Sequence, residues 1–547
     1  MDSSALRLDA TWVDYGLIAI YFVFVLGIGW AARRRVSSSI DFFLSGRGLP
    51  AWVTGLAFIS ANLGAVEIIG MSANGVQYGL QTMHYFWIGA VPAMIFLGIV
   101  MMPFYYGSKV RSVPEFMRRR FGPAAHLVNA ISFALAQLLI AGANLLLLAS
   151  VVNSLLGWPL WVTLIIAAVI VLSYITLGGL SAAIYNEVLQ FFVIIAALLP
   201  LTIIGLNRVG GWGGLKENLT ENYFHTWPGQ DLSGFNSPIW SVIGIVFGLG
   251  FVLSFGYWTT NFVEVQRAMA SESMSAARKT PIIGAFPKMF IPFIVVIPGM
   301  VAATIVGPIQ TGEAPPNEAM LYLIRDLLPN GLMGVALAGL LAAFMAGMAA
   351  NISAFNTVIS YDIWETYVVK GREDGYYLKF GRLATVIATC IAVFTALLAS
   401  NFGNVMDYLQ TLFGFFNAPL FATFLLGMFW KRMTPAAGWI GLVTGTVSAV
   451  IFWSLSLGSD PLVNLPGQGV AFLSASIAFV MDVLISVIVS LFTTPKPDEE
   501  LVGFVASVTP KENLTDVAEA ALPWYRRTVP LGMVCLALVI ILNIIFV

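Results

Sequence analysis

Phe58-Ile-Ser-Ala-Asn-Leu-Gly-Ala-Val-Glu-Ile-Ile-Gly70 is the stretch that decides the fold. It lies in an apolar segment, about 51–71, that is long enough to cross a bilayer, yet it carries Ser60, Asn62 and Glu67. In hydrocarbon each unsatisfied polar group costs several kcal/mol, so a continuous spanning helix disfavours this mixture. An interrupted helix tolerates it, because the freed carbonyls line a cavity. The stretch therefore predicts a broken helix that holds solute and ion near the membrane midplane; the alternative is a polar patch that joins two helices.

The composition indicates an integral membrane protein whose partner is the lipid bilayer. Of the 547 residues, 59% are hydrophobic and 10% are charged, whereas ordinary globular domains carry about a quarter charged residues. Cys390 and Cys535 lie in apolar segments and the three histidines are scattered, so neither a disulfide framework nor a metal cluster is expected. No cleavable signal pattern precedes the first span, which suits a bacterial inner membrane. Nucleic acid is not an expected partner.

Runs of about 20 apolar residues predict fourteen membrane-spanning helices. They cover approximately residues 12–33, 51–71, 82–104, 125–155, 158–180, 185–207, 238–266, 281–307, 331–365, 378–399, 405–429, 436–458, 468–493 and 526–547. Lys and Arg provide a check on this count, because they collect on the cytoplasmic side. If the N-terminus is outside and the spans alternate, 22 of the 27 Lys and Arg residues fall inside and Lys288 falls within a span. The four left outside are Arg7, Arg208, Lys216 and Arg325, so both termini are predicted to be extracytoplasmic.

A second interrupted helix is expected in the span 238–266. Transporters built from inverted repeats place a partner of the first broken helix about five helices later. Four glycines within thirteen residues weaken this span, because Gly costs about 1 kcal/mol relative to Ala in a helix; they are Gly244, Gly248, Gly250 and Gly256. The alternative is that these glycines allow tight helix packing.

Ionisable residues inside apolar spans usually face a cavity or one another. Glu67, Glu187, Lys288 and Asp482 lie well within spans, whereas Glu264, Asp362 and Asp407 lie near span ends and are expected to be solvated. We interpret Lys288 as a donor to a polar solute or as the partner of a buried carboxylate such as Glu67. Enzyme activity is not expected, because the sequence lacks a phosphate-binding glycine loop, a nucleophile elbow and a His–carboxylate pair.

Four further blocks resemble the sodium/solute symporter family, most closely its sodium/galactose and sodium/glucose cotransporters. They are Asp41-Phe-Phe-Leu-Ser-Gly-Arg-Gly-Leu-Pro50, Ser112-Val-Pro-Glu-Phe-Met-Arg-Arg-Arg-Phe121, Gly178-Gly-Leu-Ser-Ala-Ala-Ile-Tyr-Asn-Glu-Val-Leu-Gln190 and Phe424-Leu-Leu-Gly-Met-Phe-Trp-Lys-Arg432. The resemblance implies an all-α, fourteen-helix form of the five-plus-five inverted-repeat fold, with discontinuous first and sixth core helices. It divides the chain into an extra helix and inner loop (1–50), the first repeat (51–207), the second repeat with outer loops (208–429) and accessory helices (430–547).

The resemblance also implies a sodium site at the first broken helix. Its backbone oxygens fall on Ser60 and Leu63, and its ligands from the eighth core helix fall on Ala343, Ala346 and Gly347. The last two positions carry hydroxyls in the family, so two oxygen ligands are missing here. Water, Asn351 or Ser353 could replace them, since a small hard cation needs several oxygen ligands. Glu187 is similar to the acidic residue of the family's sodium exit path.

The sugar site of the family is partly kept. Asn62, Glu67, Lys288 and Gln410 fall on its polar positions, and Ser254 stands where an Asn is usual. Phe86 replaces a glutamate that binds sugar hydroxyls, which separates this chain from the galactose and glucose carriers. Tyr257, followed by Trp258, resembles the inner aromatic gate. For each position the alternative is ordinary helix packing.

The expected function is that of a secondary transporter that works by alternating access and couples the symport of a sugar-like polar solute to sodium. No cofactor is expected, and Na+ is the coupling ion. One alternative keeps the fold without sodium, as a facilitator or as a proton-coupled carrier in which Glu67 or Glu187 titrates. A second alternative, from another class, is a transporter-like sensor that binds solute and signals to a partner.

Overall fold

The computed structural model describes residues 6–34, 36–227, 229, 231–235, 237–399, 405–458, 460–465 and 468–547. Within these residues the chain is helical, and the bridge between Leu49 and Ser271 is its one isolated strand-like contact. Twelve helices of this part of the chain are long and apolar enough to cross a membrane. They are Trp12–Arg33, Tyr85–Gly107, Pro123–Ser154, Gly179–Arg208, Pro238–Thr260, Met274–Ile305, Leu332–Val368, Asp374–Ala399, Val405–Phe429, Pro435–Ser454, Gly469–Phe492 and Thr528–Ile545.

Two of the predicted spans take other forms. The segment 51–71 is a bent pair, Ala51–Asn62 followed by Val66–Met83, with an angle of 55° between its halves. The segment 158–180 holds the shorter apolar helix Leu160–Ser173, which Gly179 (φ +55°) separates from the next span. The chain is thus an all-helical membrane protein, while fourteen crossings and the five-plus-five repeat stay predictions.

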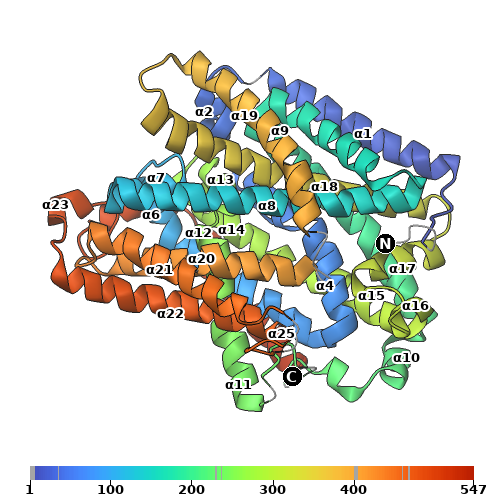
Figure 1. Ribbon diagram of the computed structural model, residues 1–547. Coiled ribbons are helices and arrows are strands. Elements are labelled where there is room, and N and C mark those ends of the chain that lie inside the picture. Colours follow the sequence, from blue (N-terminus) through green and yellow to red (C-terminus); the bar gives the residue numbers. More distant parts are fainter. Residues whose placement is uncertain are drawn as a thin grey trace.

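The elements follow in the order shown in Figure 1, where the long helices α8, α20, α21 and α22 run in roughly one direction across the view. Up to residue 224 they are α1 (Trp12–Arg33), α2 (Ser39–Leu44), η1 (Ser45–Arg47), α3 (Ala51–Asn62), α4 (Ala65–Tyr78), η2 (Gly79–Met83), η3 (Tyr85–Ala90), α5 (Val91–Phe96), η4 (Leu97–Met101), α6 (Met102–Gly107), α7 (Val113–Phe121), α8 (Pro123–Leu156), α9 (Leu160–Arg208), α10 (Gly211–Asn218) and η5 (Glu221–Phe224). The elements after it are α11 (Pro238–Ile243), η6 (Gly244–Ser254), α12 (Phe255–Thr260), α13 (Phe262–Met269), α14 (Met274–Lys288), α15 (Ile291–Ile305), α16 (Gly307–Gln310), η7 (Pro316–Glu318), α17 (Ala319–Leu327), α18 (Leu332–Thr357), η8 (Val358–Val368), α19 (Asp374–Ala399), α20 (Val405–Phe429), α21 (Pro435–Ser454), α22 (Gly469–Phe492), α23 (Asp498–Leu501), η9 (Lys511–Leu514), α24 (Val517–Ala520), η10 (Trp524–Arg526) and α25 (Thr528–Ile545).

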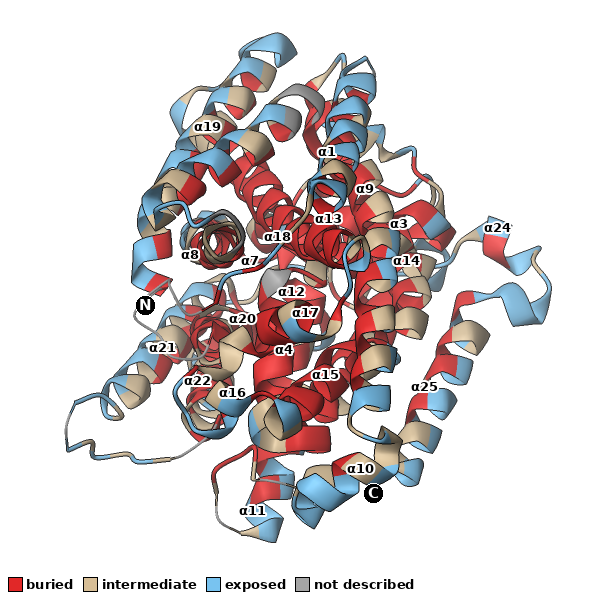
Figure 2. Cartoon of the chain, turned by 90° about the vertical axis from the view of Figure 1, so that its right-hand side faces the viewer, coloured by how far each residue is buried: buried red, intermediate tan, exposed pale blue. Residues whose placement is uncertain are grey.

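The helices sort into a buried core and a lipid-exposed rim. The span that contains α18 is 89% buried inside the protein, whereas the spans formed by α1 and α25 are 28% and 22% buried. Figure 2 shows the same division, with α4, α13 and α18 in the red centre and α19 and α25 at the exposed periphery. Helix α18 contacts α3, α4, α8 and α9, so the broken helix lies against the most buried of the membrane-spanning helices described.

The interruption predicted at the glycines of span 238–266 lies elsewhere. The glycine-rich segment stays helical as the π-helix η6 and continues into α12. A Cβ on Gly250 would lie 2.9 Å from Ile88 Cγ2, and one on Gly256 would lie 2.9 Å from the backbone oxygen of Asn417. These glycines therefore serve close packing. The chain leaves the helix at Asn261 (φ −70°, ψ 114°), whose side-chain oxygen accepts a hydrogen bond from the Val263 N–H and starts α13.

Two of the family-like blocks join distant helices near one end of α20. The buried guanidinium of Arg120 donates to the backbone oxygen of Gly427 (2.8 Å), in the last turn of α20, and to that of Met433 (3.1 Å), just after this helix. The Ser112 hydroxyl caps α7 by accepting from the Glu115 N–H at 3.0 Å. This arrangement ties α7 to the end of α20, because carbonyls at a helix end lack helical partners.

The other two family-like blocks meet beside α9. A Cβ on Gly179 would lie 2.5 Å from the backbone oxygen of Phe42, so only glycine fits here. The hydroxyls of Ser45 and Ser181 are 2.6 Å apart and share a hydrogen bond. These blocks thus carry packing contacts that hold neighbouring helices together at one end of α9.

Glu115 gives the fold a testable acid sensitivity. Burial raises the pKa of Glu115, but a hydrogen bond from the Arg111 N–H (2.6 Å) and an ion pair with Arg119 (2.6 Å) outweigh it and hold that pKa below the ordinary 4.5. The resulting stability is present above the unfolded pKa and is lost as pH falls through the folded pKa.

We therefore expect Glu115→Gln to lower the stability of the purified protein by about 1–3 kcal/mol at pH 7, a typical value for hydrogen bonds to a charged group. The difference from wild type should shrink as the pH falls below 4, which thermal melting in detergent at both pH values would measure. Glu365→Gln, which removes the partly exposed partner of Arg111 at 3.0 Å, is the control and should change stability less. An equal Glu115→Gln effect at both pH values would contradict the assignment.

Candidate functional site

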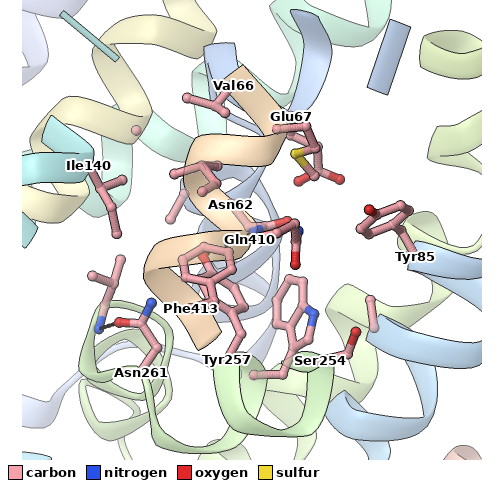
Figure 3. A pocket seen from close by; sticks show the side chains of 18 of the residues that line it. Asn62, Val66, Glu67, Tyr85, Ile140, Ser254, Tyr257, Asn261, Gln410 and Phe413 are labelled. Carbon is pink, nitrogen blue, oxygen red and sulfur yellow. Dashed lines mark hydrogen bonds between the residues drawn. The ribbon is translucent and has the colours of Figure 1, made fainter. Parts of the chain in front are cut away.

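A cavity opens beside the break between α3 and α4. It holds about 810 Å³ of space not filled by atoms, including its open side. Side chains from α3, α4, η3, α12, α14 and α20 line it. Figure 3 shows Asn62, Glu67 and Gln410 close together in this space, with Tyr85 and Ser254 to one side.

The break itself consists of two buried residues between α3 and α4. Leu63 (φ −73°, ψ 48°) ends α3, and Gly64 (φ −78°, ψ 179°) is extended before α4 begins. The Gly64 N–H donates a hydrogen bond to the backbone oxygen of Asn62 at 2.7 Å. The predicted interruption is therefore present, and it lies against the core helix α18.

The structure brings the predicted solute positions together. All six line the cavity, although they come from segments up to 348 positions apart; they are Asn62, Glu67, Phe86, Ser254, Lys288 and Gln410. The two predicted gate residues, Tyr257 and Trp258, line it as well. The Tyr257 ring packs against Phe413 with centroids 4.6 Å apart.

Lys288 is the charged centre of the cavity. It forms an ion pair with Glu67 and donates to the Asn62 side-chain oxygen. Its ammonium nitrogen also lies 4.9 Å from the ring centre of Phe86 and 5.1 Å from that of Trp258. The Lys288 side chain is 2% exposed and that of Glu67 8%, so each charge depends on the other, as the sequence interpretation allowed.

A hydrogen-bond chain leads from this ion pair to a buried carboxylate. The Asn62 amide donates to the Tyr257 hydroxyl at 3.0 Å, and that hydroxyl donates to Glu264 at 2.7 Å. Glu264 is fully buried, so the prediction that it is solvated is wrong. Hydropathy places Glu264 at the end of a span, where a side chain is expected to reach water. The structure places it in α13, whose residues are all buried.

Glu187 lies outside the cavity lining. It forms a two-point ion pair with Arg267, at 2.5 and 3.2 Å, and both side chains are fully buried. Arg267 also donates to the Val263 oxygen at 2.8 Å. The role of Glu187 in an ion path stays a prediction.

Two further interpretations are corrected by buried pairs. His126 Nε2 lies 2.8 Å from Asp362 Oδ1, and both side chains are buried. The sequence interpretation that no His–carboxylate pair exists is therefore wrong, and so is the interpretation of Asp362 as solvated.

Asp482 faces no charged group among the described residues. Its carboxylate accepts hydrogen bonds from Thr423 (2.7 Å) and Ser486 (2.8 Å) and joins α20 to α22.

The predicted sodium positions lie around the break. A Cβ on Gly64 would lie 3.4 Å from Gly347 Cα and 3.6 Å from the Ala343 oxygen. Gly347 lines the cavity, while Ala346, Leu63 and Ser60 are buried. Of the two suggested replacement ligands, Asn351 lines the cavity and Ser353 does not.

Sequence reasoning missed three polar residues of the cavity lining, Tyr85, Asn144 and Asn261. Asn144, in α8, is the one beside the predicted sodium positions. Its side chain lines the cavity beside Gly64 and Gly347. An Asn within an apolar span was the available signal, but the spacing to its neighbours gave no hint of contact.

A model of the sodium:solute symporter family matches residues 42–445. The chain belongs to this family of membrane transporters. Relatives include a sodium/glucose cotransporter of Vibrio parahaemolyticus, 29% identical over 86% of this chain and 90% of the relative. Sodium/glucose cotransporter 1 of Oryctolagus cuniculus is 29% identical over 89% of this chain and 80% of the relative.

Solved structures agree with the fold. A Na+-coupled sialic acid symporter in a substrate-bound outward-open state superposes with a TM-score of 0.74, covering 89% of this chain and 98% of that one at 18% identity. The nucleobase-cation-symport-1 family transporter Mhp1, in a closed conformation with bromovinylhydantoin bound, gives 0.51 at 14% identity, covering 82% and 92%. At such identities the likeness concerns the fold alone.

Proposed function

We propose that this protein is a sodium-coupled symporter that carries a sugar-like polar solute by alternating access. The observation that carries the proposal is the cavity beside the broken helix, which gathers all six predicted solute positions around the Lys288–Glu67 pair. The family membership and the sodium/glucose cotransporters among its relatives support it.

The chemistry of the cavity suits a polyhydroxylated solute. The amides of Asn62 and Gln410 can both donate and accept, and Lys288 and Glu67 supply charged donors and acceptors. The rings of Tyr257 and Trp258 stand at 85° to each other, and each offers an apolar face of the kind that packs on a sugar. Phe86 supplies no hydrogen-bond acceptor. It therefore favours a solute in which the edge facing Phe86 is less polar than the edge of a simple hexose.

Sodium would supply the driving force. One charge that crosses about 100 mV provides roughly 2.3 kcal/mol. Backbone oxygens freed at the interruption are typical ligands of coupling sodium ions in transporters with broken helices. A cation bound there favours one conformation and thereby raises the population that binds solute.

We propose further that both termini are extracytoplasmic, that the membrane is a bacterial inner membrane and that the four-part division of the chain holds. The Leu8 N–H donates to the Ser154 oxygen (3.3 Å), and the Thr226 N–H donates to the Phe546 oxygen (3.2 Å). The Lys and Arg distribution predicts that the segments around Ser154 and Thr226 lie on the outer side. The contacts of the terminal segments with them support placing both termini on that side.

The test is uptake of a labelled sugar panel into proteoliposomes, with and without an inward sodium gradient at fixed pH. Accumulation that requires sodium is the expected result. Equilibration without accumulation would replace symport by facilitation, and flux that follows pH instead of sodium would favour proton coupling. Binding without flux would favour a sensor.

Phe86 is expected to set the preference among solutes. Phe86→Glu adds an acceptor beside Lys288, so we expect the KM for unmodified glucose or galactose to fall about tenfold, the equivalent of one hydrogen bond of about 1.4 kcal/mol. Phe86→Leu, which removes the ring without adding an acceptor, is the matched control and should not lower the hexose KM. Equal effects of both substitutions would show that space, and not hydrogen bonding, decides the preference.

A further inference from the structure

Asn144 carries a buried oxygen that has no partner within the described part of the chain. The residue is 3% exposed and lies in the middle of α8. Its amide nitrogen donates to the Ile140 oxygen at 3.2 Å, whereas its side-chain oxygen accepts no hydrogen bond. A buried acceptor without a partner costs about 1–3 kcal/mol, and a bound ion or water is one way in which a protein satisfies such a group.

The orientation of this amide follows from its donor. Oxygen and nitrogen of an Asn side chain are assigned from the surrounding hydrogen bonds. The contact with the Ile140 oxygen requires the nitrogen on that side, because a carbonyl oxygen cannot donate. The side-chain oxygen of Asn144 therefore points the other way, toward the broken helix.

The free oxygen faces the break and the core helix together. A Cβ on Gly347 would lie 2.7 Å from Asn144 Oδ1, and a Cβ on Gly64 would lie 3.3 Å from it. The same point on Gly64 is 3.6 Å from the Ala343 backbone oxygen. The Asn144 oxygen thus occupies the space that a side chain at position 347 would fill, next to a backbone carbonyl of α18 and the extended residue of the break.

Oxygen chemistry at this place fits a small hard cation. Such ions take carbonyl and carboxylate oxygens in preference to nitrogen or sulfur. An amide oxygen offers two lone pairs and no hydrogen that would repel the ion. Positions 346 and 347 offer no side-chain oxygen, since they are Ala and Gly.

We propose that the side-chain oxygen of Asn144 is a ligand of the coupling sodium ion and replaces the side-chain oxygen that position 347 lacks. This inference rests on the sodium coupling proposed above. It assigns one ligand of the ion to α8, so that the ion links α8 with the broken helix and α18. Position 347 then has to be glycine, because any larger residue would displace the Asn144 oxygen from the ion.

The test uses sodium alone on the purified full chain. Melting temperature and tracer sodium binding are measured against sodium chloride at constant ionic strength with choline chloride. Wild type should melt at higher temperature as sodium rises, by mass action on the folded state. Asn144→Leu, of similar size but without the oxygen, should raise the half-saturating sodium concentration at least tenfold.

Matched variants separate the ligand role from packing. Asn129→Leu removes another buried Asn of α8, fifteen residues away, and should leave the half-saturating sodium concentration unchanged. Asn144→Asp keeps an oxygen and adds charge, so it should lower that concentration, and it serves if Asn144→Leu does not fold. Gly347→Ser should weaken sodium binding through its clash with Asn144, whereas Asn144→Ala with Gly347→Ser should restore binding by returning a hydroxyl to position 347.

The outcomes distinguish this inference from the function on which it rests. If wild type responds to sodium and Asn144→Leu shows the same half-saturating concentration, the ligand assignment is overturned while symport stands. A weaker affinity for solute measured without sodium, together with unchanged sodium binding, would make Asn144 a solute contact and would also overturn it. A wild-type protein that ignores sodium in both measurements would overturn the inference and the sodium coupling together.

Discussion

Replacing Lys288 with methionine is expected to reduce solute uptake at least a hundredfold. The substitution removes the central donor of the cavity and leaves the buried Glu67 without its partner. Removing one member of a buried ion pair typically costs about 3–5 kcal/mol, so the melting temperature should fall as well. Uptake into proteoliposomes and thermal melting of the same preparation measure the two effects.

A double substitution separates the contribution to stability from the contribution to solute binding. Lys288→Met with Glu67→Gln removes both charges, so no buried charge is left unpaired and the melting temperature should recover toward wild type. Uptake should stay low, because neither the ammonium donor nor the carboxylate acceptor is present. Recovery of uptake in the double variant would show that the pair serves only the fold.

Replacing Arg267 with methionine is expected to destabilise the protein by about 3–5 kcal/mol, because Glu187 is then fully buried and unpaired. The lost hydrogen bond to the Val263 oxygen adds to this cost. Arg267→Met with Glu187→Leu should regain most of the stability, since apolar residues can replace a buried pair at little cost.

The control for this prediction is an exposed pair. Lys431 and Asp498 are 3.1 Å apart, with side chains 56% and 60% exposed. Lys431→Met should therefore leave the melting temperature close to that of wild type. Similar losses for Lys431→Met and Arg267→Met would contradict the weight given to burial.

The first interruption could be predicted because its residues conflict with their surroundings. A polar side chain such as Asn62 in a spanning helix requires a cavity or a partner, and the sequence shows the conflict directly. The pairing of Lys288 with Glu67 was one of two interpretations that the same constraint allowed, since two opposite charges in hydrocarbon stabilise each other. Both predictions rest on the free energy of burying an unpaired polar or charged group. This cost is several kcal/mol, which is large compared with the net stability of a protein.

The remaining features depend on contacts between distant segments. A glycine in a helix has the same sequence signal whether it marks a break or a close contact, so the interruption was expected near Gly250 and occurs at Asn261. Hydropathy marks where an apolar run ends but not whether the next turn is buried, which explains the wrong interpretation of Glu264. The pairing of His126 with Asp362 joins residues 236 positions apart, beyond any local pattern.

Both polar atoms of the Asn62 side chain hold a hydrogen bond before any solute arrives. Its oxygen accepts from Lys288, and its nitrogen donates to the Tyr257 hydroxyl. A solute that displaces either of these partners from Asn62 exchanges an existing hydrogen bond for a new one, and such an exchange changes the free energy little. We therefore expect a modest affinity for the solute and a fast release of it. For a carrier that has to release its solute in every transport cycle, fast release raises the turnover rate.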